Sequence, residues 1–470
     1  MVFKLQRPPL ELLDSIVTKV QLDNPHVQEL EERIHRFHME QAQTSEMLDE
    51  RNMCIELLRS YLKSDGIRKQ IDSQGIRINL LTVFGSFATH CAGKDSDLDV
   101  CVCASVQGKR KTLPVTILQA IHRDLEHNKD SKHLFGEFKI HEISFVQTAR
   151  IPIIRFKMNN ISVDMSASFH ATPPRTSLAA KYINAYCQLD DRFQILVTFL
   201  KHWLKSEGNP NTHLRDYPNS YSLILMLIHV LQWFDIVPNL HQTHKELFHS
   251  KNFKSWSLTE VDHEFRYPLD QNTIELHRRK ETRKLSVVQL LFLFACQYSE
   301  SSIMEFYRFN MRSGEIEWRT IREPITIVDA YDTRNPGRTI QSAADIMGAL
   351  RELIYLFSVP EVDMFKNLIK ITTKKTYLFP KERFPIRVQS SLSQHVQKRE
   401  KNRQHQNRAQ NQQQYQYPGY GHFFMPPPPM VGVHPNSPFF HYSQPQHQLY
   451  AFGKFPFSNL QFRPDFYGHF

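Results

Sequence analysis

The sequence has few cysteines and no long apolar run, and each absence removes a class of protein. Six cysteines are spread over 470 residues, and none stands in a CxxC pair. This spacing argues against a disulfide framework and a structural zinc site, and it favours a reducing compartment. The longest apolar stretches, over 221–234 and 290–296, fall short of the about 20 residues that span a bilayer. The first residues also lack the apolar core of a signal peptide. We therefore expect an intracellular protein with no membrane partner.

The positive charge is unevenly distributed along the chain. The net charge is +10, from 58 Lys and Arg against 48 Asp and Glu. Residues 388–470 hold seven of the basic residues but only two acidic ones, among many Gln, Asn, His, Pro, Tyr and Phe residues. With almost no aliphatic side chains, this segment buries too little surface to offset its ordering entropy. We predict a disordered C-terminal tail there, and both an interaction role and an inert tail stay open.

Hydrophobic periodicity divides the rest of the chain into parts of different texture. Apolar residues recur at helical spacing over 9–62, short β-rich runs follow over 76–170, and helical texture returns over 176–385. Two β-rich runs separated by Asn159 and Asn160 predict a hairpin. We expect N-terminal helices that belong to a central domain, an α/β domain, a helical domain and the tail, over 1–62, 63–175, 176–387 and 388–470.

Three acidic residues of the α/β segment stand in a pattern that suits metal ions. Asp97 and Asp99 lie at the start of a predicted strand, two residues apart, so their side chains share a face. Two carboxylates that close repel each other, and a hard divalent cation relieves the repulsion while it also binds phosphate oxygens. Asp164 follows on the predicted hairpin. Three such carboxylates suit a two-metal phosphoryl transfer.

Gly85 and Ser86 stand between a predicted strand and a predicted helix. Backbone N–H groups and a hydroxyl at such a junction suit a polyphosphate. Each motif alone is common, since an Asp-x-Asp is often a solvated strand end and a Gly-Ser is often only a turn. Their order along the chain is more specific, and it favours an active site.

The segment FGSFATHCAGKDSDLDVCV resembles the signature of the DNA polymerase β-type nucleotidyltransferase superfamily. Within that superfamily, roughly residues 40–360 are similar to the cytoplasmic-type poly(A) polymerases and terminal uridylyltransferases. LKHWLKSEG resembles a family helix with two lysines, NSYSLILMLIHVLQ its Ser-Tyr helix, and LSVVQLLFLFACQY with the later RNPGRTI its poly(A)-polymerase-associated region. The resemblance implies an α+β, bilobal nucleotidyltransferase, in which a small mixed β-sheet catalytic domain is inserted into a mostly helical central domain.

The resemblance also implies an activity, which is template-independent addition of ribonucleotides to RNA 3′-OH ends. Asp97, Asp99 and Asp164 would hold Mg²⁺ or Mn²⁺ and carry the catalysis. The triphosphate would meet Gly85, Ser86, Lys201, Lys205 and Ser220, of which the two lysines are i, i+4 on one helix face. Tyr221 would stack on the base, Thr176 would lie near the ribose, and Arg334 and Asn335 would lie in a loop over the base edge.

Two positions depart from the family pattern. Arg175 stands where many members have an Asn that contacts the ribose, and Arg334 stands where UTP-selective members have a His. We therefore expect AMP to be slightly favoured over UMP. Two other functions stay open, namely a weak or inactive member that acts as an RNA-binding scaffold in RNA–protein granules, and a small-molecule nucleotidyltransferase.

No RNA-recognition motif or zinc finger is visible in the sequence. We therefore expect an RNA-binding or granule partner protein, or the tail, to supply RNA specificity. We expect the protein in the cytoplasm, with RNA granules and the nucleus left open as further locations.

Overall fold

A computed structural model describes residues 4–20, 22–106, 114–149, 151–169, 175–207, 218–248, 280–319, 323–340 and 343–358. All of these residues belong to the first of two units, Met1–Phe379, and the predicted tail over 388–470 lies outside them. None of the helices described combines the length and the apolar character that crossing a membrane requires.

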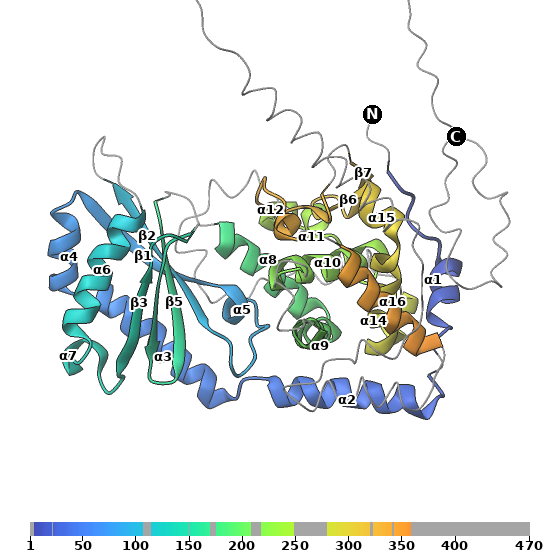
Figure 1. Cartoon of the computed structure of the whole chain (residues 1–470), viewed down its shortest axis with the longest axis horizontal. Coiled ribbons are helices and arrows are strands. Elements are labelled where there is room, and N and C mark those ends of the chain that lie inside the picture. Colours follow the sequence, from blue (N-terminus) through green and yellow to red (C-terminus); the bar gives the residue numbers. More distant parts are fainter. Residues whose placement is uncertain are drawn as a thin grey trace, which may run out of the picture. The chain divides into compact units, whose positions relative to one another are not determined.

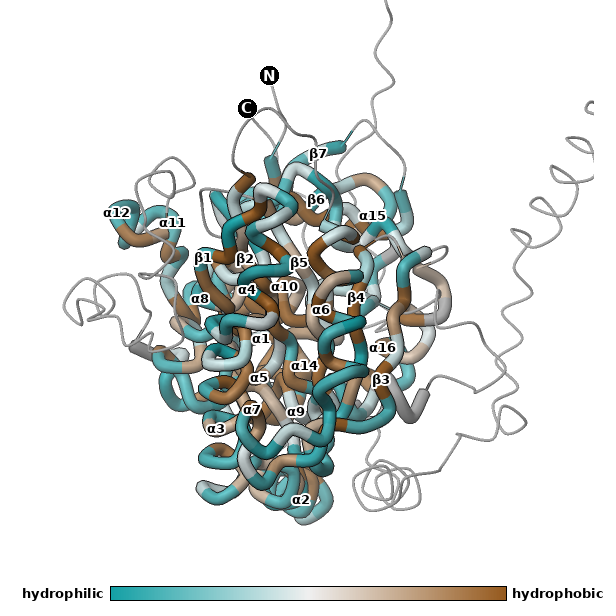
Figure 2. Tube along the Cα trace, turned by 90° about the vertical axis from the view of Figure 1, so that its left-hand side faces the viewer, coloured by the Kyte–Doolittle hydropathy of each residue, from teal (hydrophilic) through white to brown (hydrophobic). Residues whose placement is uncertain are grey.

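The N-terminal segment forms helices, as its apolar spacing predicts. They are α1 (Leu10–Val17), α2 (Pro25–Gln41), α3 (Ser45–Leu62) and α4 (Asp65–Asp72). The side chain of Asn24 accepts a hydrogen bond from the backbone N–H of His26 and caps the start of α2. Only one stripe of α2 is buried, through Val27, Leu30 and Ile34, and Figure 2 accordingly shows this helix as largely hydrophilic.

A mixed five-stranded sheet follows, in the order β1-β2-β5-β4-β3. Its strands are β1 (Ile76–Phe84), β2 (Leu98–Val106), β3 (Ile140–Val146), β4 (Ile153–Met158) and β5 (Ile161–Ser168). The pair β2 and β5 is parallel, and the other pairs are antiparallel. The predicted hairpin is confirmed, because β4 and β5 pair around Asn159 and Asn160, and Asn159 has the positive φ of 51° that a tight turn favours.

Helices cover one side of this sheet and close its core. In Figure 1, α4, α6 (Pro114–Asn128) and α7 (Lys132–Phe135) lie beside the sheet, and their apolar side chains join those of the strands in one buried cluster. Phe156, Met165 and Ile121 are fully buried in it. Truncation of such side chains to Ala typically costs about 2–5 kcal/mol, so this core holds β2 and β5 firmly in register.

The rest of the described chain is mostly helical, as predicted. Its helices are α8 (Arg175–Leu189), α9 (Asp191–Glu207), α10 (Ser220–Trp233), α11 (Leu240–Thr243), α12 (Lys245–Phe248), η3 (Lys280–Lys284), α14 (Val287–Ser299), α15 (Ser301–Phe306), η4 (Pro336–Thr339) and α16 (Ala344–Ser358). Glu31 of α2 accepts hydrogen bonds of 2.9 and 2.7 Å from the backbone N–H groups of Val287 and Val288. A carboxylate at a helix N-terminus is favourable, so α2 is tied to the start of α14.

A second, small sheet interrupts the helical part, and the sequence analysis did not predict it. It consists of β6 (Tyr307–Asn310), β7 (Glu315–Trp318) and β8 (Thr326–Val328), in the order β7-β6-β8. Strands of three or four residues are too short for a period of two to stand out from a helical pattern. The chain leaves β8 through residues 329–335, which we call the 329–335 loop, and this loop reaches the candidate site.

Candidate active site

The strand register brings two of the predicted carboxylates together. In the parallel pair of β2 and β5, Asp99 lies opposite Asp164, and in the pair of β1 and β2, Phe84 lies opposite Asp99. Directly paired residues project to the same face of a sheet, and neighbouring strands are about 4.8 Å apart. Asp97 directly precedes β2 and is exposed. The start of β2 and the part of β5 beside it therefore carry all three acidic residues.

Gly85 adjoins this acidic region because β1 ends at Phe84 and the short helix α5 (Gly85–Ala88) starts at the next residue. The φ of Gly85 is +69°, a conformation that L residues with a side chain rarely adopt. A Cβ atom at this position would also fall onto the carboxylate of Asp99, with its Cγ only 2.7 Å away. Both facts require glycine here, and they place the start of α5 directly against Asp99.

The loop before Asp97 is fixed from α3. The buried Arg51 donates hydrogen bonds from Nη2 to the carbonyl oxygens of Lys94, at 3.1 Å, and Ser96, at 2.9 Å. The backbone N–H of Gly93 donates to Ser96 Oγ at 2.9 Å. Buried hydrogen bonds of a charged donor are costly to lose, so Arg51 helps to determine where Asp97 stands.

One of the three carboxylates, that of Asp99, has a raised pKa. Burial raises the pKa of Asp99 to about 7, with further contributions from the negative charges of Asp164 and Asp97, while Lys201 acts in the opposite direction. Arg155 holds Asp164 through two hydrogen bonds of 2.9 and 3.0 Å.

Within the described parts of the chain, no three His, Cys, Asp or Glu side chains converge closely enough to hold a metal ion. The three carboxylates are nevertheless the oxygen ligands that Mg²⁺ takes, so the donor set fits such an ion.

A cavity of about 770 Å³ opens beside the carboxylates. Its walls come from both halves of the described structure, including the end of β1, the starts of α8 and α10, the middle of α9 and the 329–335 loop. Most of the predicted site residues line it, namely Gly85, Ser86, Asp97, Asp99, Thr176, Lys201, Ser220 and Tyr221. Residues from distant parts of the sequence are thus brought to one cavity.

Four predicted residues do not line this cavity as described. Asp164 is turned to Arg155, and Arg334 is exposed and binds Asp332. Asn335 shapes its own loop, because its Oδ1 accepts hydrogen bonds of 2.9 Å from the backbone N–H groups of Ile327 and Gly337. Lys205 lies on α9, but its side chain is outside the described structure.

Lys201 and Tyr221 stand on different walls of the cavity. The ammonium group of Lys201 donates to the carbonyl oxygen of Cys91 at 3.3 Å. The hydroxyl of Tyr221 donates to Asp329 Oδ2 at 2.8 Å, and burial, together with the charge of Asp329, raises the pKa of that hydroxyl well above its usual value. The pair fixes the ring of Tyr221 on the wall of the cavity.

The sequence analysis missed two acidic residues of the cavity wall, Asp329 and Asp332. Asp329 accepts hydrogen bonds at Oδ1 from the backbone N–H groups of Tyr331 and Asp332, at 2.7 and 2.8 Å. Asp332 is bound by Arg334 and by Arg175, the two residues that depart from the family pattern. Burial acts to raise the pKa of Asp332, but hydrogen bonds from Arg334 outweigh it and hold the pKa well below its usual value. No local sequence signal marks either acid, since both follow a three-residue strand.

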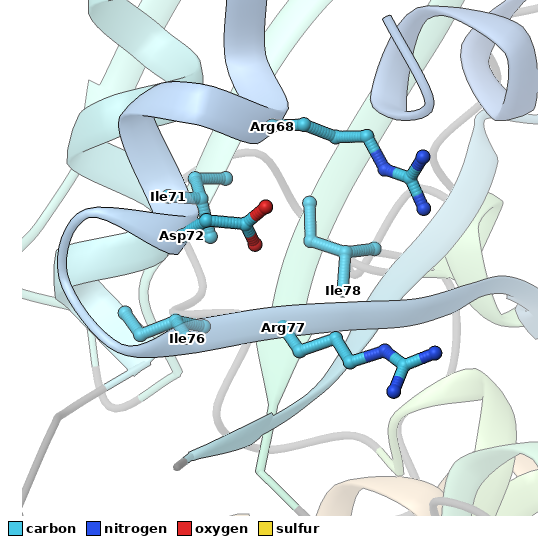
Figure 3. Close-up of a pocket in the computed structure, with 6 residues that line it drawn as sticks. All are labelled: Arg68, Ile71, Asp72, Ile76, Arg77 and Ile78. Atoms are coloured by element: carbon cyan, nitrogen blue, oxygen red, sulfur yellow. The ribbon is translucent and has the colours of Figure 1, made fainter. Parts of the chain in front are cut away.

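A second cavity, of about 510 Å³, lies between α4 and the start of β1. Figure 3 shows Arg68 and Arg77 extending their guanidinium groups to the same side, with Asp72 as the acidic residue of the lining. Asp72 is a lone carboxylate there, so this cavity lacks the paired acids that distinguish the first one. The candidate active site is therefore the cavity beside Asp97 and Asp99.

Comparison with known proteins finds similarity to poly(A) polymerases and a terminal uridylyltransferase. A family model described as "Poly(A) RNA polymerase, mitochondrial-like, central palm domain" matches residues 30–182. The chain is similar to the Caenorhabditis elegans protein "Poly(A) RNA polymerase gld-2", at 25% identity over 322 residues, which cover 66% of this chain and 25% of the worm protein. It is also similar to the Schizosaccharomyces pombe protein "Terminal uridylyltransferase cid1", at 27% identity over 168 residues, which cover 34% of this chain and 37% of that protein. The chain thus spans well under half the length of either relative.

Solved structures share the fold. One from a GLD-2/RNP-8 complex has a TM-score of 0.54 and 21% identity, over 73% of this chain and 98% of that chain. One of mtPAP in complex with UTP has a TM-score of 0.55 and 18% identity, over 78% of this chain and 76% of that chain. At such identities the likeness establishes the fold, and the chemistry must be argued from the site.

Proposed function

Because the chain belongs to the nucleotidyltransferase family of poly(A) polymerases and terminal uridylyltransferases, we propose that it adds ribonucleotides to RNA 3′-OH ends without a template. One observation carries this proposal. Asp99 is paired with Asp164 on the sheet and lies against the Gly85 turn. It also lines a cavity that is large enough for a nucleotide. In this proposal, residues 63–175 are the catalytic domain, and 1–62 and 176–387 form the helical central domain.

The three carboxylates have separate tasks in the proposal. Asp97 and Asp99 would hold two divalent ions, Mg²⁺ or Mn²⁺, and Asp164 would complete one site after exchange of its partner Arg155. When bound, such ions supply the positive charge that makes a hydroxyl a better nucleophile and neutralises phosphate oxygens. Asp99 needs that charge most, because burial and its acidic neighbours disfavour its ionised form.

Two walls of the cavity, one at the start of α5 and one formed by α9 and α10, would bind the triphosphate. The backbone N–H groups at Gly85 and Ser86 and the hydroxyl of Ser86 stand beside the carboxylates, where phosphate oxygens would lie. Lys201 and Ser220 line the same cavity and would contact the phosphates from α9 and α10. Lys205, one turn after Lys201 on α9, is proposed to join them.

The ring of Tyr221 would carry the base. Stacking on an aromatic ring suits any base, because every base has a π-face, so Tyr221 would bind a nucleotide without selecting it. The hydrogen bond to Asp329 holds the ring in place. Thr176 would lie near the ribose. We propose a slight preference for AMP over UMP, on the ground that Arg334 replaces the His of UTP-selective relatives.

RNA selection is proposed to come from outside the site. The described cavity has no feature that would read an RNA sequence, so we propose a protein partner or the 388–470 segment for that role. One structural neighbour comes from a complex with RNP-8, which supports a protein partner. We propose the cytoplasm as the place of action, and RNA granules and the nucleus stay open.

The proposal is tested by incubating the purified protein with an oligoribonucleotide and each of the four NTPs, singly and mixed, in Mg²⁺ or Mn²⁺. The extended ends are then sequenced. The matched control is the same RNA with a 3′-deoxy terminus, which lacks the attacking hydroxyl. We expect extension of the 3′-OH RNA alone. The absence of any extension, or transfer to a small molecule instead of RNA, would overturn the proposal.

A further inference from the structure

The two residues that depart from the family pattern meet at one carboxylate. Arg175 Nη1 donates to Asp332 Oδ1 at 2.7 Å. Arg334 donates from Nε and Nη2 to Asp332 Oδ2 at 3.0 and 2.7 Å. The backbone N–H groups of Thr333 and Arg334 also donate to Oδ1, at 2.7 and 3.1 Å. The side chain of Asp332 is only 18% exposed, and its lone pairs are largely filled by these donors.

The bond between Arg175 and Asp332 joins two walls of the candidate active site. Arg175 is the first residue of α8, Asp332 belongs to the 329–335 loop, and both line the cavity. The two residues are 157 positions apart in the chain. The bond thus connects the helix that follows the catalytic sheet with a loop that follows β8.

Other contacts hold the same loop from the helical part. Arg312 Nε donates to the carbonyl oxygens of Asp329 and Ala330 at 3.0 and 3.1 Å, and Tyr221 donates to Asp329 at 2.8 Å. Arg312 Nη2 also donates to the backbone carbonyl oxygen of Asp332 at 3.3 Å. These contacts hold the backbone of the loop, whereas Arg175 binds the side chain of Asp332 from α8.

We propose that Arg175 is a positioning residue, which latches the 329–335 loop against α8 through Asp332 and thereby sets the affinity for the nucleoside triphosphate. The inference rests on the proposed function, because it takes the cavity to hold a triphosphate. In this proposal Asp332 binds Arg175 and does not contact the base, since its acceptor positions are already occupied. A guanidinium suits this task better than an ammonium, because its planar fork fixes the direction of the bond.

A purely structural role would show a different effect. The side chain of Arg175 is 57% exposed, and exposed ion pairs contribute little to the stability of a folded protein. Loss of the pair should therefore leave the melting temperature nearly unchanged. A latch should instead act on nucleotide binding and leave the chemical step alone, which separates KM from kcat.

The test is a double-mutant cycle on the full chain with Arg175→Gln, Asp332→Asn and the double variant. Asn retains an oxygen acceptor for the backbone N–H groups of the loop. We measure Kd for a non-hydrolysable ATP analogue and for the UTP counterpart, and KM and kcat for RNA extension. Each single change should raise Kd and KM about three- to tenfold with kcat nearly unchanged, and the double variant should be no worse than the worse single variant. Arg175→Lys should restore part of the affinity.

The matched control is the exposed pair of Lys132 and Glu137 on the catalytic domain, at 3.3 Å, changed to Gln singly and together. These variants should bind nucleotide like the wild type. Additive losses in the Arg175 and Asp332 cycle, or an unchanged Kd in Arg175→Gln, would overturn the latch. A wild type that binds nucleotide, shows the coupling and extends no RNA would overturn the proposed function and leave the latch supported. A wild type that binds no nucleotide would overturn both.

Discussion

Asp99 on β2 and Asp164 on β5 lie directly opposite each other on parallel strands, although 65 positions separate them in the chain. The pairing puts two carboxylates on one face of the sheet, and burial with this neighbour raises the pKa of Asp99 to about 7. Two carboxylates placed this close together do not stabilise the fold, so the pair is better explained by a function than by stability. The arrangement suits a site that a cation completes.

Gly85→Ala should abolish most activity and also cost stability. The new Cβ would fall onto the Asp99 carboxylate, and the φ of +69° disfavours any side chain, at a cost of about 1–2 kcal/mol. RNA extension rates and urea unfolding measure the two effects. Gly348→Ala is the matched control, because a Cβ there meets nothing within 4 Å on α16, and it should keep full activity. If the Gly85→Ala variant extends RNA at the wild-type rate, the proposed role of this turn is contradicted.

Arg51→Gln should lower the extension rate about tenfold by loosening the loop before Asp97. The buried guanidinium bonds two carbonyl oxygens of that loop, and loss of such bonds costs about 1–3 kcal/mol. The Mg²⁺ concentration for half-maximal activity should rise, because Asp97 is less well placed. Arg59 lies on the same helix, pairs with Glu56 at 2.6 Å and has a side chain that is 15% exposed, and it provides the control Arg59→Gln. An unchanged Mg²⁺ requirement in Arg51→Gln would argue against positioning through this loop.

Arg155→Gln should strengthen metal binding. Arg155 is the present partner of Asp164 and competes with a cation for the same oxygens. Because an exposed ion pair is worth about 0–1 kcal/mol, Mn²⁺ affinity should rise about two- to fivefold. Isothermal titration calorimetry with Mn²⁺ and no nucleotide measures this without relying on activity. Lys157→Gln serves as control, because Lys157 lies on the same strand as Arg155 and pairs with Glu142 of β3. An equal gain in that variant would point to general charge instead of competition.

The sequence predicted the elements whose signals are local. The hairpin around Asn159 and Asn160, the N-terminal helices and the strand–Gly–helix junction at Gly85 all have short-range signatures, and the structure shows each of them. The sequence could not predict that Asp99 pairs with Asp164, because the register of a parallel pair depends on the packing of the whole sheet. The functional roles of these residues stay predictions.

The sequence also could not predict contacts between residues that lie far apart in the chain. Arg175 and Arg334 were recognised as departures from the family pattern, but nothing in either segment indicates that both bind Asp332. The three short strands β6, β7 and β8 lack a readable period, so the sheet that leads into the 329–335 loop was missed. Sequence patterns show the chemistry of a site more readily than the second set of residues that holds it in place.

Acidification should destabilise the protein in part through His229. Burial lowers the pKa of His229 in the folded protein to about 4, from 6.5, and its Nε2 lies 3.3 Å from the carbonyl oxygen of Glu315. Between these values the unfolded chain binds the proton and the folded protein does not. The contribution of His229 to the free energy of unfolding is therefore fully present above pH 6.5, and it falls by about 2–3 kcal/mol as the pH falls toward 4.

Urea unfolding as a function of pH measures this loss. His229→Gln retains a group that can donate to Glu315 but has no titrating ring, so its stability should vary less between pH 6.5 and 4. His35→Gln, an exposed histidine of α2 paired with Glu31, is the control and should follow the wild-type curve. Identical pH profiles for His229→Gln and the wild type would contradict the burial argument.

The most direct test of the central claim is single-turnover extension of a 3′-OH oligoribonucleotide by Asp97→Ala and Asp99→Asn, beside the exposed Asp130→Ala as control. Circular dichroism melting shows whether each variant stays folded. Metal-dependent phosphoryl transfer predicts that both site variants lose at least about a thousandfold in rate, keep the wild-type fold, and that Asp130→Ala extends RNA normally. A folded Asp97→Ala or Asp99→Asn protein that extends RNA at the wild-type rate would contradict the account.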